Sequence, residues 1–571
     1  MSRTEHAVVA TLVGLFALGF GLNYGTSNQT TYLLESVRAL HPSLWLRDWA
    51  VMHNQMYHPA YAWLGKLLLE LSSTGYAIGA ANVVCIALGM WLIFRLLRLF
   101  GRPERTIVAL CAVLLIGSVT RTQGPGGTYA YSEIFQPSTL GSLGLTLAGL
   151  AFVAGSPLWS GLGLALGGAF HVNYLVLSLA AFGTAWLLIE RERLWSKAAL
   201  SRLCLGLGPP LLVLVYFLPL LLASGNMNAA REAHRIYLDV RAPHHYDVPR
   251  FAWDFAFFCG FQLLGAAALA SAARRGSAVH QRTLALLAGT WLLVIPAALL
   301  SSVVVVRFAQ QLFAWRICGV ADLFAQAAFA TLLVNVLCDG KRALAKEGSL
   351  ERGLFALGLG SLVIGSLVTR RFPIGLVVVC PVLVAWFVTR GFPRRLVPAD
   401  GGLTLSAATT GLALALAGVN VLRFAKLPAR SNLLSGVEPG VAELCAWARA
   451  NTPEDALFLS PPQEDEVRFR CERAIVVDWK SNPAVPSEVL EWYARIEDVT
   501  GVRPFLREAD LDGYQALDET RVALLRERYG FDYVVVERGH EILGLGAPAF
   551  SGSRLVAYAL PPREATALAT K

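Results

Sequence analysis

An aspartate in a polar, aromatic loop is the residue of this sequence best suited to acid–base chemistry. Residues 28–59 follow the first apolar segment and are too polar to cross a bilayer. Within them, Asp48 stands in the motif WLRDW, between two tryptophans. Indole rings favour the headgroup region of a membrane, and a carboxylate beside that low-dielectric boundary holds a proton more readily. The motif predicts a general base at Asp48; the alternative is a structural ion pair of Asp48 with Arg47 or Arg38.

Basic and aromatic side chains in a later loop suit the binding of a phosphate. The sequence RAPHHYD places Arg241, His244, His245 and Tyr246 together. A guanidinium gives bidentate hydrogen bonds to phosphate oxygens, and imidazoles add further donors. Adjacent histidines cannot share one face of a helix or strand, so a two-histidine metal site is not expected here. The alternative is a loop of the aromatic belt whose polar groups bind water.

Further basic side chains lie at the ends of apolar segments. Arg307 and Arg316 border one such segment, and an arginine so close to hydrocarbon needs an anion, either a protein carboxylate or a lipid phosphate. His171 precedes another, where it would either cap a helix turn or contact a substrate. Lys480 follows a predicted strand, and α/β sheets bind ligands at the carboxyl ends of their strands. The alternative for Lys480 is an ion-pair network that ties the C-terminal part to the loops.

A pair of acids is the candidate metal site. Glu133 precedes the fourth apolar segment and, with Asp48, would supply carboxylate oxygens to a divalent cation such as Mg²⁺ or Mn²⁺. The cysteines show neither CxxC nor the Cys/His spacing typical of zinc. Most fall in or beside apolar segments, but Cys445 and Cys471 do not, and these two would be able to form a disulfide outside the cytoplasm.

The composition indicates a membrane protein. Of the 571 residues, 55% are hydrophobic and 16% are charged, whereas soluble domains carry about 25% charged residues. Apolar segments of near-spanning length recur about thirteen times between residues 7 and 423. Clusters of Lys and Arg follow the second, sixth, eighth, tenth and twelfth of these segments. The positive-inside rule makes that side cytoplasmic, with a cytoplasmic N-terminus and an external C-terminal part.

The C-terminal part is predicted to be a small α/β domain. From Arg430 onward the chain carries 16 Lys and Arg but 23 Asp and Glu, a balance typical of a soluble domain. Short apolar runs at 456–460, 474–478 and 532–536 suit buried parallel strands, and helical periodicity separates them. This order predicts a Rossmann-like sheet without GxGxxG, so no nucleotide is expected. The excess of base elsewhere is topogenic, so no nucleic acid is expected either.

This arrangement resembles the GT-C superfamily of integral membrane glycosyltransferases. The shared features are a first span, a long external loop with an acid, many further spans and an external α/β domain. More narrowly, the chain is similar to an uncharacterised bacterial branch with a domain of unknown function. The motifs of that branch fall here on Asn28, Gln29, Tyr32, Leu33 and Asp48, on PHHY at 243–246, and on the stretch 451–483.

The resemblance implies a division of the chain and a role for its first loop. The transmembrane GT-C-like domain would cover residues 1–425, with its first external loop at 25–58, and the external domain would cover 430–571. In the superfamily the acid of this loop is a catalytic base or a metal ligand, which maps onto Asp48. Asn28 and Gln29 belong to the same loop motif and are candidates for substrate binding.

The sequence therefore favours a membrane glycosyltransferase of a bacterial inner membrane that works on its external, periplasmic face. It would take a sugar from a polyprenyl-phosphate-linked donor lipid and pass it to a glycan, lipid or protein acceptor. Two other interpretations stay open: a transporter or flippase of an amphiphile, and an inert scaffold of an envelope polysaccharide assembly. A transporter needs polar side chains at mid-membrane, and few fall within the predicted spans.

Overall fold

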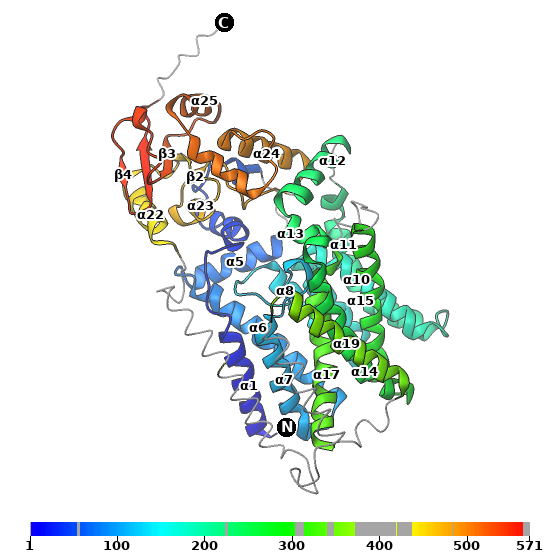
Figure 1. Cartoon of the computed structure of the whole chain (residues 1–571). Helices are drawn as coiled ribbons and strands as arrows, with labels where there is room; N and C mark the ends of the chain where they lie inside the picture. Colours follow the sequence, from blue (N-terminus) through cyan, green and yellow to red (C-terminus); the bar gives the residue numbers. More distant parts are fainter. Residues whose placement is uncertain are drawn as a thin grey trace. The chain divides into compact units, whose positions relative to one another are not determined.

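The chain forms two compact units (Figure 1). The computed structural model describes residues 2–53, 58–222, 227–302, 313–339, 348–371, 418, 437–483 and 485–562. The predicted site residue Arg307 lies outside this range. The last two predicted apolar segments, at 373–389 and 403–423, also lie outside it, apart from residue 418. The first unit, here the helical unit, comprises Met1–Leu22, Gly79–Pro219 and His244–Ala429. The second, the sheet unit, comprises Asn23–Ile78, Leu220–Pro243 and Arg430–Lys571.

The helical unit is a bundle of apolar helices. Within the described residues, nine helices are long and apolar enough to cross a membrane, which makes this a multi-pass membrane protein. Two predicted spans correspond to helices of only 16 and 14 residues, α1 and α9. The long helices, with those two, are α1 (Arg3–Leu18), α6 (Tyr76–Phe100), α7 (Thr106–Thr120), α8 (Pro137–Ala154), α9 (Pro157–Phe170), α10 (Val172–Glu190), α11 (Lys197–Leu222), α14 (Ala252–Arg274), α15 (Ala278–Ser302), α17 (Cys318–Asp339) and α19 (Ser349–Val368).

Glycines allow the closest helix pairs of this bundle. A Cβ added to Gly144 of α8 would lie 2.5 Å from the backbone nitrogen of Gly167 in α9. A Cβ added to Gly260 of α14 would lie 2.6 Å from Leu362 in α19. Small residues at such contacts let membrane helices approach closely, where there is no hydrophobic force between them. The short segments between helices are therefore held on a closely packed frame.

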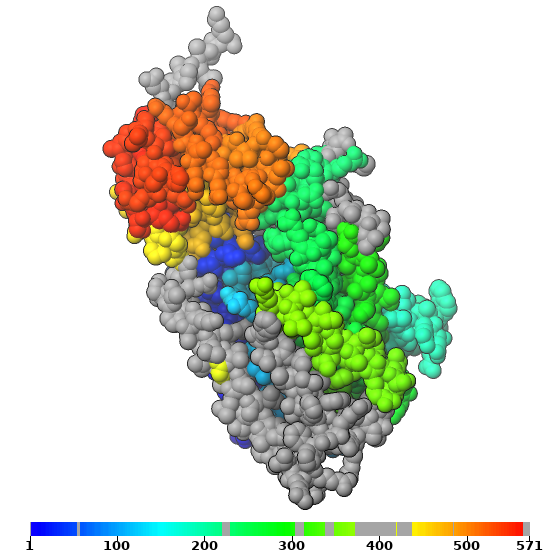
Figure 2. Space-filling model, viewed as in Figure 1, coloured from blue at the N-terminus to red at the C-terminus, as the bar shows by residue number. Residues whose placement is uncertain are grey.

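The sheet unit contains one mixed five-stranded sheet with the strand order β2-β1-β3-β5-β4. Strands β1 (Leu457–Leu459), β2 (Ala474–Ile475) and β3 (Tyr533–Glu537) are parallel, as predicted. Strand β5 (Leu555–Ala559) runs antiparallel to β3, and β4 (Phe550–Ser551) pairs with β5; both are additions to the predicted sheet. In the space-filling view this C-terminal part, yellow through red, forms a continuous surface (Figure 2).

Helices cover both faces of the sheet because side chains alternate along its strands. Phe458, Ile475 and Val535 point to the face covered by α22 (Pro439–Asn451) and α23 (Glu466–Cys471). Leu459 and Val534 point to the opposite face. That second face is covered by α24 (Pro486–Thr500), the 3₁₀ segment η6 (Glu508–Ala516) and α25 (Glu519–Tyr529).

Two segments far away in the sequence belong to this unit. The first loop supplies α2 (Gln29–Tyr32), α3 (Leu34–Arg38), α4 (Trp49–His53) and α5 (Pro59–Leu71). The segment before the PHHY motif supplies α12 (Met227–Arg235) and the π-helix η3 (Ile236–Arg241). Ile236 and Val240 of η3 are buried in the same core as Trp492 of α24.

Trp45 differs from its expected place at the membrane surface, and the predicted disulfide between Cys445 and Cys471 is present. Trp45 is 0% exposed and its indole nitrogen donates to the Arg468 carbonyl at 3.1 Å, so it is buried among protein atoms rather than exposed like an interfacial indole. Cys445 and Cys471 form a disulfide that joins α22 to the end of α23. Both features fasten the region around Arg468.

Candidate functional site

The sheet unit buries Asp48 in an ion pair. Its Oδ2 accepts hydrogen bonds from Arg468 Nε at 2.7 Å and from the backbone nitrogen of Ile475 at 3.0 Å, and its Oδ1 accepts one from the Val51 nitrogen at 3.1 Å. Asp48 is 0% exposed and Arg468 is 1% exposed. A second acid, Asp478, also pairs with Arg468. One guanidinium thus pairs with two carboxylates in the interior.

Asp48 forms an ion pair, as the alternative interpretation predicted, but the predicted partners Arg47 and Arg38 are wrong. Arg47 pairs instead with Asp532 at 2.6 Å, and Arg38 donates to the Val51 carbonyl at 3.3 Å. The partner, Arg468, lies 420 residues further along the chain. In this geometry both Asp48 oxygens already accept hydrogen bonds, so the side chain joins the first loop to α23 and to the edge strand β2.

Gln29 also acts on the conformation of this loop. It is buried and its Oε1 accepts a hydrogen bond from the Gly25 nitrogen at 2.7 Å. Asn28 precedes α2, and its carbonyl accepts from the Tyr32 nitrogen at 3.0 Å. Beside them, the Thr31 hydroxyl lies 3.2 Å from the Ser481 hydroxyl, which follows β2. The substrate contacts of Asn28 and Gln29 stay predictions.

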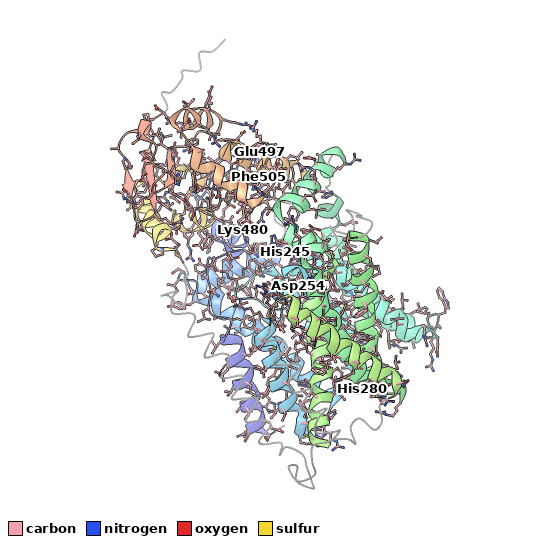
Figure 3. All side chains as sticks on the ribbon, viewed as in Figure 1. His245, Asp254, His280, Lys480, Glu497 and Phe505 are labelled. Atoms are coloured by element: carbon pink, nitrogen blue, oxygen red, sulfur yellow. A yellow bond between two sulfur atoms is a disulfide. The ribbon has the colours of Figure 1, made fainter. Side chains whose placement is uncertain are left out.

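Arg241 and Lys480, chosen separately from the sequence, lie next to each other in the sheet unit (Figure 3 labels Lys480). Arg241 Nη2 donates to the Lys480 carbonyl at 3.5 Å, and its guanidinium lies 5.1 Å from the centre of the Trp479 ring. Burial lowers the pKa of Arg241. Burial, followed by the positive charge of Arg241, lowers the pKa of Lys480. Two basic side chains that are close in space and partly buried favour the binding of an anion.

The charge of an acid, Asp465, acts on these two cations. Burial, followed by the negative charge of Asp478, raises the pKa of the Asp465 carboxyl to about 7, and the charge of Lys480 opposes that rise. The loop that carries Asp465 follows β1, and its Pro462 carbonyl accepts a hydrogen bond from the Trp479 nitrogen at 2.8 Å. Asp465 and Lys480 therefore come from the carboxyl ends of two neighbouring parallel strands, where α/β sheets bind ligands.

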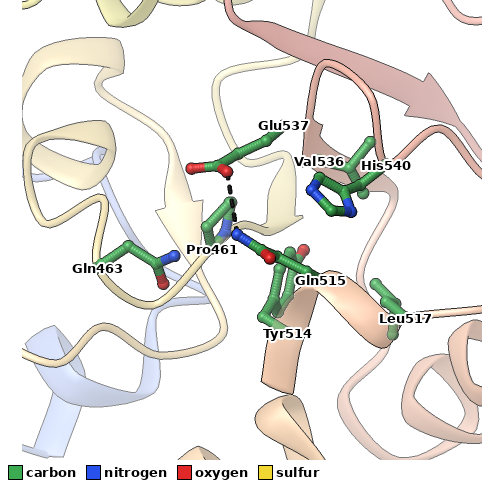
Figure 4. Close-up of a pocket in the computed structure, with 8 residues that line it drawn as sticks. All are labelled: Pro461, Gln463, Tyr514, Gln515, Leu517, Val536, Glu537 and His540. Carbon is green, nitrogen blue, oxygen red and sulfur yellow. Dashed lines mark hydrogen bonds between the residues drawn. The ribbon is translucent and has the colours of Figure 1, made fainter. Parts of the chain in front are cut away.

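A narrow pocket lies at the same edge of the sheet, beyond β1 and β3 (Figure 4). The space between its lining residues does not admit a water molecule. In Figure 4 the Gln515 amide points toward Glu537, to which it donates at 3.3 Å. The chain order changes direction between β1 and β3, the position that favours ligands in such sheets. Its lining residues are Pro461, Gln463, Tyr514, Gln515, Leu517, Val536, Glu537 and His540.

The helical unit brings together two other predicted residues, Arg316 and His171. Arg316 Nη1 donates to His171 Nε2 at 2.5 Å, and the guanidinium lies 4.5 Å from the centre of the Phe313 ring. Arg316 Nε is buried and has no hydrogen-bond partner within the described part of the chain. Among the described residues, Arg316 thus pairs with an imidazole and with no carboxylate, which is consistent with the expectation that Arg316 binds an external anion.

The histidines of the PHHY motif lie in the short helix α13 (Pro243–Tyr246). His245 Nδ1 lies 2.7 Å from the Gly126 carbonyl, and its own carbonyl accepts from Trp315 Nε1 at 2.9 Å. Gly126 has a φ of +64°, and a Cβ there would lie 2.7 Å from Trp315 Nε1. The rings of His244 and His245 are 4.1 Å apart, and Tyr246 is buried. Figure 3 labels His245 in this unit.

The metal prediction rests on Glu133 and Asp48. Glu133 is half exposed and lies 3.6 Å from Arg121 in an ion pair. Among the described residues, no group of three or more His, Cys, Asp or Glu side chains is arranged to hold a metal ion. Because Glu133 and Asp48 belong to different units, their shared metal site stays a prediction.

The sequence analysis did not predict two residues of these clusters: Arg468, which pairs with Asp48, and Asp465, whose charge acts on Arg241 and Lys480. One signal was available for Asp465, which lies in the acidic run QEDE directly after a predicted strand. Arg468 had no such signal, because its partner Asp48 is distant in the chain.

Comparison with known proteins identifies the fold. Residues 440–499 match the model of a domain of unknown function (DUF6798), and no curated protein matches the chain. ArnT from Cupriavidus metallidurans bound to undecaprenyl phosphate is similar in structure, with a TM-score of 0.53 and 14% identity over 98% of both chains. Its apo form gives 0.50 and 13% over 97% of both chains. An Archaeoglobus fulgidus oligosaccharyltransferase gives 0.45 and 11%, over 94% of this chain and 69% of its own.

The similarity to ArnT extends over nearly the whole of both chains, from the apolar helices to the C-terminal sheet. Identity of this order shows the fold and leaves activity to be argued from the site. The protein has the fold of the GT-C membrane glycosyltransferases.

Proposed function

We propose that this protein is a membrane glycosyltransferase that uses a sugar linked to polyprenyl phosphate. The observation that carries the proposal is the adjacent pair Arg241 and Lys480 in a chain with the GT-C fold. The similar ArnT structure contains undecaprenyl phosphate, a lipid of the same class. Arg241 contacts the backbone of Lys480, and the guanidinium and ammonium of these residues would offer a phosphate both charge and hydrogen bonds.

The carrier phosphate has a candidate site in each unit, and each is proposed by itself. In the sheet unit, Arg241 and Lys480 would bind the phosphate, and Asn28 and Gln29 would contact the sugar. In the helical unit, Arg316 and His171 would bind the phosphate, and further lipid contacts are proposed for His244, His245, Tyr246 and Arg307. The acceptor, a glycan, lipid or protein, would meet the C-terminal sheet at the carboxyl ends of its parallel strands.

The reaction would take place outside the cytoplasm of a bacterium. The disulfide between Cys445 and Cys471 supports this, because disulfides persist in oxidising compartments. The basic clusters between the predicted spans support the same orientation.

Asp48 has two proposed roles, and one variant separates them. As a general base it would take the proton of the acceptor hydroxyl, for which an oxygen must leave its present hydrogen bonds. As a structural residue it would only hold the first loop. Asp48→Asn protein, assayed below its melting temperature, should lose about 10²–10⁴-fold in the rate of transfer if Asp48 is the base. Near-wild-type transfer per folded molecule assigns the structural role.

Binding of the carrier lipid tests the proposed function directly. Protein purified in nanodiscs is incubated with polyprenyl phosphate and examined by native mass spectrometry, beside Arg241→Gln and an Arg250→Gln control. Arg250 is exposed and pairs with Asp247 on the surface. We expect a retained lipid in wild type and control, and its loss in Arg241→Gln. Failure of wild type to retain the lipid would favour the transporter or the scaffold.

A further inference from the structure

We propose that the helical unit binds a monovalent cation, Na⁺, between α14 and α17, held by the Asp322 carboxylate and the side-chain oxygens of Gln262 and Gln326. Few polar side chains fall within the predicted spans, and these three belong to that small set. Asp322 and Gln326 lie on α17 and Gln262 lies on α14, two helices that Figure 1 labels. The inference does not depend on the proposed glycosyltransferase function, since none of these residues belongs to the candidate carrier sites.

Asp322 is a buried acid inside the bundle. It is 4% exposed, and its Oδ1 accepts a hydrogen bond from Gln262 Nε2 at 2.8 Å. Its helix, α17, is more fully buried than any other spanning helix of the described residues. The described ion pairs of α14 involve Arg274 and Asp254, at the two ends of that helix, and no described ion pair involves Asp322. A carboxylate in this position needs a positive partner, because a charge inside a membrane protein is costly when it stands alone.

Two glutamine oxygens near this carboxylate lack a donor. Gln262 is 1% exposed and Gln326 is 3% exposed. The Oε1 atom of each is buried and has no hydrogen-bond partner within the described part of the chain. Gln326 follows Asp322 by four residues, which puts both side chains on the same face of α17. Buried acceptors without a donor are costly, so a group that supplies positive charge to these oxygens would stabilise the pair of helices.

The backbones of α14 and α17 are in contact at this level of the bundle. A Cβ added to Gly265 would lie 2.7 Å from the Cα of Ala325 and 3.0 Å from its carbonyl oxygen. Gly265 follows Gln262 by three residues, and Ala325 follows Asp322 by three, so the two contacts belong to one register. Gln326 is the next residue after Ala325. The three side chains therefore start from backbone within one turn of a close helix contact.

The number of acceptors favours a metal ion over a proton. A proton on Asp322 provides one O–H donor, which satisfies one glutamine oxygen and leaves the other without a partner. A metal ion contacts several oxygens at once, and a set of carboxylate and carbonyl oxygens suits a hard cation.

The net charge favours a monovalent ion. One positive charge balances the single carboxylate, whereas a divalent ion would leave an uncompensated charge in a low-dielectric interior. Mg²⁺ and Ca²⁺ also require about six or more oxygen ligands, and the cluster supplies fewer. Na⁺ is the hard monovalent cation that meets both conditions.

Binding of radioactive sodium to the full-length protein in nanodiscs, followed by scintillation proximity, measures the site directly. Choline chloride replaces NaCl to keep the ionic strength constant. We expect saturable binding in wild type and a melting temperature that rises with the Na⁺ concentration, because an ion that binds only the folded state stabilises it. Asp322→Asn should bind no sodium, and its melting temperature should not depend on Na⁺.

Gln326→Leu tests the contribution of a glutamine oxygen. The substitution removes a buried acceptor without leaving another polar group unpaired, so this variant tests the site even where Asp322→Asn does not fold. We expect Na⁺ to bind about tenfold more weakly. Ser366→Ala is the matched control. Ser366, on α19, is 4% exposed and its hydroxyl also has no hydrogen-bond partner among the described residues, but it lies outside the cluster and its loss should leave Na⁺ binding unchanged.

Several results would overturn the inference. No saturable sodium binding in wild type would do so and would assign a proton to Asp322 instead. Equal binding in Asp322→Asn, unchanged affinity in Gln326→Leu, or the same loss in Ser366→Ala would remove the proposed ligands. Displacement of sodium by an equal concentration of Mg²⁺ would contradict the charge balance. None of these results bears on the carrier lipid, so a failure here is distinct from a failure of the proposed function.

Discussion

Replacing Asp48 with asparagine measures how much the buried ion pair stabilises the sheet unit. The carboxylate accepts from Arg468 Nε at 2.7 Å, from the Ile475 nitrogen at 3.0 Å and from the Val51 nitrogen at 3.1 Å. An amide has one oxygen, so its NH₂ group must face at least one of these donors. Arg468, 1% exposed, is left with Asp478 as its remaining charged partner. Losing a hydrogen bond between charged groups costs about 1.5–3 kcal/mol and leaving a buried donor unsatisfied about 1–3 kcal/mol, so we expect a loss of about 3–5 kcal/mol in the free energy of unfolding.

This cost should appear as a large fall in melting temperature. A domain of roughly 150–250 residues loses about 2–4 °C per kcal/mol, so we expect a fall of about 6–20 °C. Thermal unfolding of the purified protein in nanodiscs, followed by near-ultraviolet circular dichroism, measures it. Asp455→Asn is the control: it makes the same change at an exposed position of the same unit and should melt like wild type. If Asp48 lay at a hydrated membrane surface, as the sequence suggests, Asp48→Asn would also leave the melting temperature unchanged.

A double-mutant cycle ties the effect to the pair itself. Once Asp48 is gone, Arg468 has lost one of its two carboxylate partners, so Arg468→Gln should cost less in the Asp48→Asn background than in wild type. Asp48→Asn protein that melts within about 1 °C of wild type would refute the energetic reasoning, since surface changes have effects of that size. Additive effects of the two substitutions would refute the pairing.

Three further predictions follow from other contacts. Arg316→Gln should weaken binding of the carrier lipid by about 1.5–3 kcal/mol, and Arg316→Lys should recover part of that loss, as lipid titrations would show; equal affinity in both variants and wild type contradicts the assignment. Reducing the Cys445–Cys471 disulfide, whose partners are 26 residues apart, should lower the stability of the sheet unit by about 3–4 kcal/mol, measured by melting with and without reductant. A reporter fused after Lys571 should be active only outside the cytoplasm, and cytoplasmic activity would reverse the orientation.

The sequence allowed prediction of those parts of the site that lie at strand ends. Three apolar runs identify β1, β2 and β3, because buried parallel strands must be apolar on both faces. Lys480 follows from the position of β2, since ligands bind beyond the carboxyl ends of such strands. Arg241 follows from the phosphate-binding character of its loop. Their adjacency could not be predicted, because only the packing of η3 on α24 brings the two segments together.

The hairpin of β4 and β5 escaped prediction for a local reason. β4 has two residues, too few to show the alternation by which a strand is recognised. β5 has five, of which the first four are buried, and it follows the small polar sequence SGSR. Its apolar face is defined by β3, with which it pairs from Leu555 to Ala559, and that partner is not evident from the hairpin sequence.

Asp48 shows why a residue type and its neighbours can predict chemistry and yet misjudge the surroundings. The motif WLRDW reads as a wet, interfacial loop because the sequence does not reveal that α23 covers it. The covering requires Arg468 inside a protein core, and a buried guanidinium requires carboxylates from whichever segment can reach it. Asp478, just after β2, and Asp48, in the first loop, both pair with Arg468. Two segments that are separated in the sequence by the helical unit therefore belong to one folded unit. A substitution at Asp48 can therefore abolish activity through folding alone. Only transfer per folded molecule, measured beside stability, can assign Asp48 a role in catalysis.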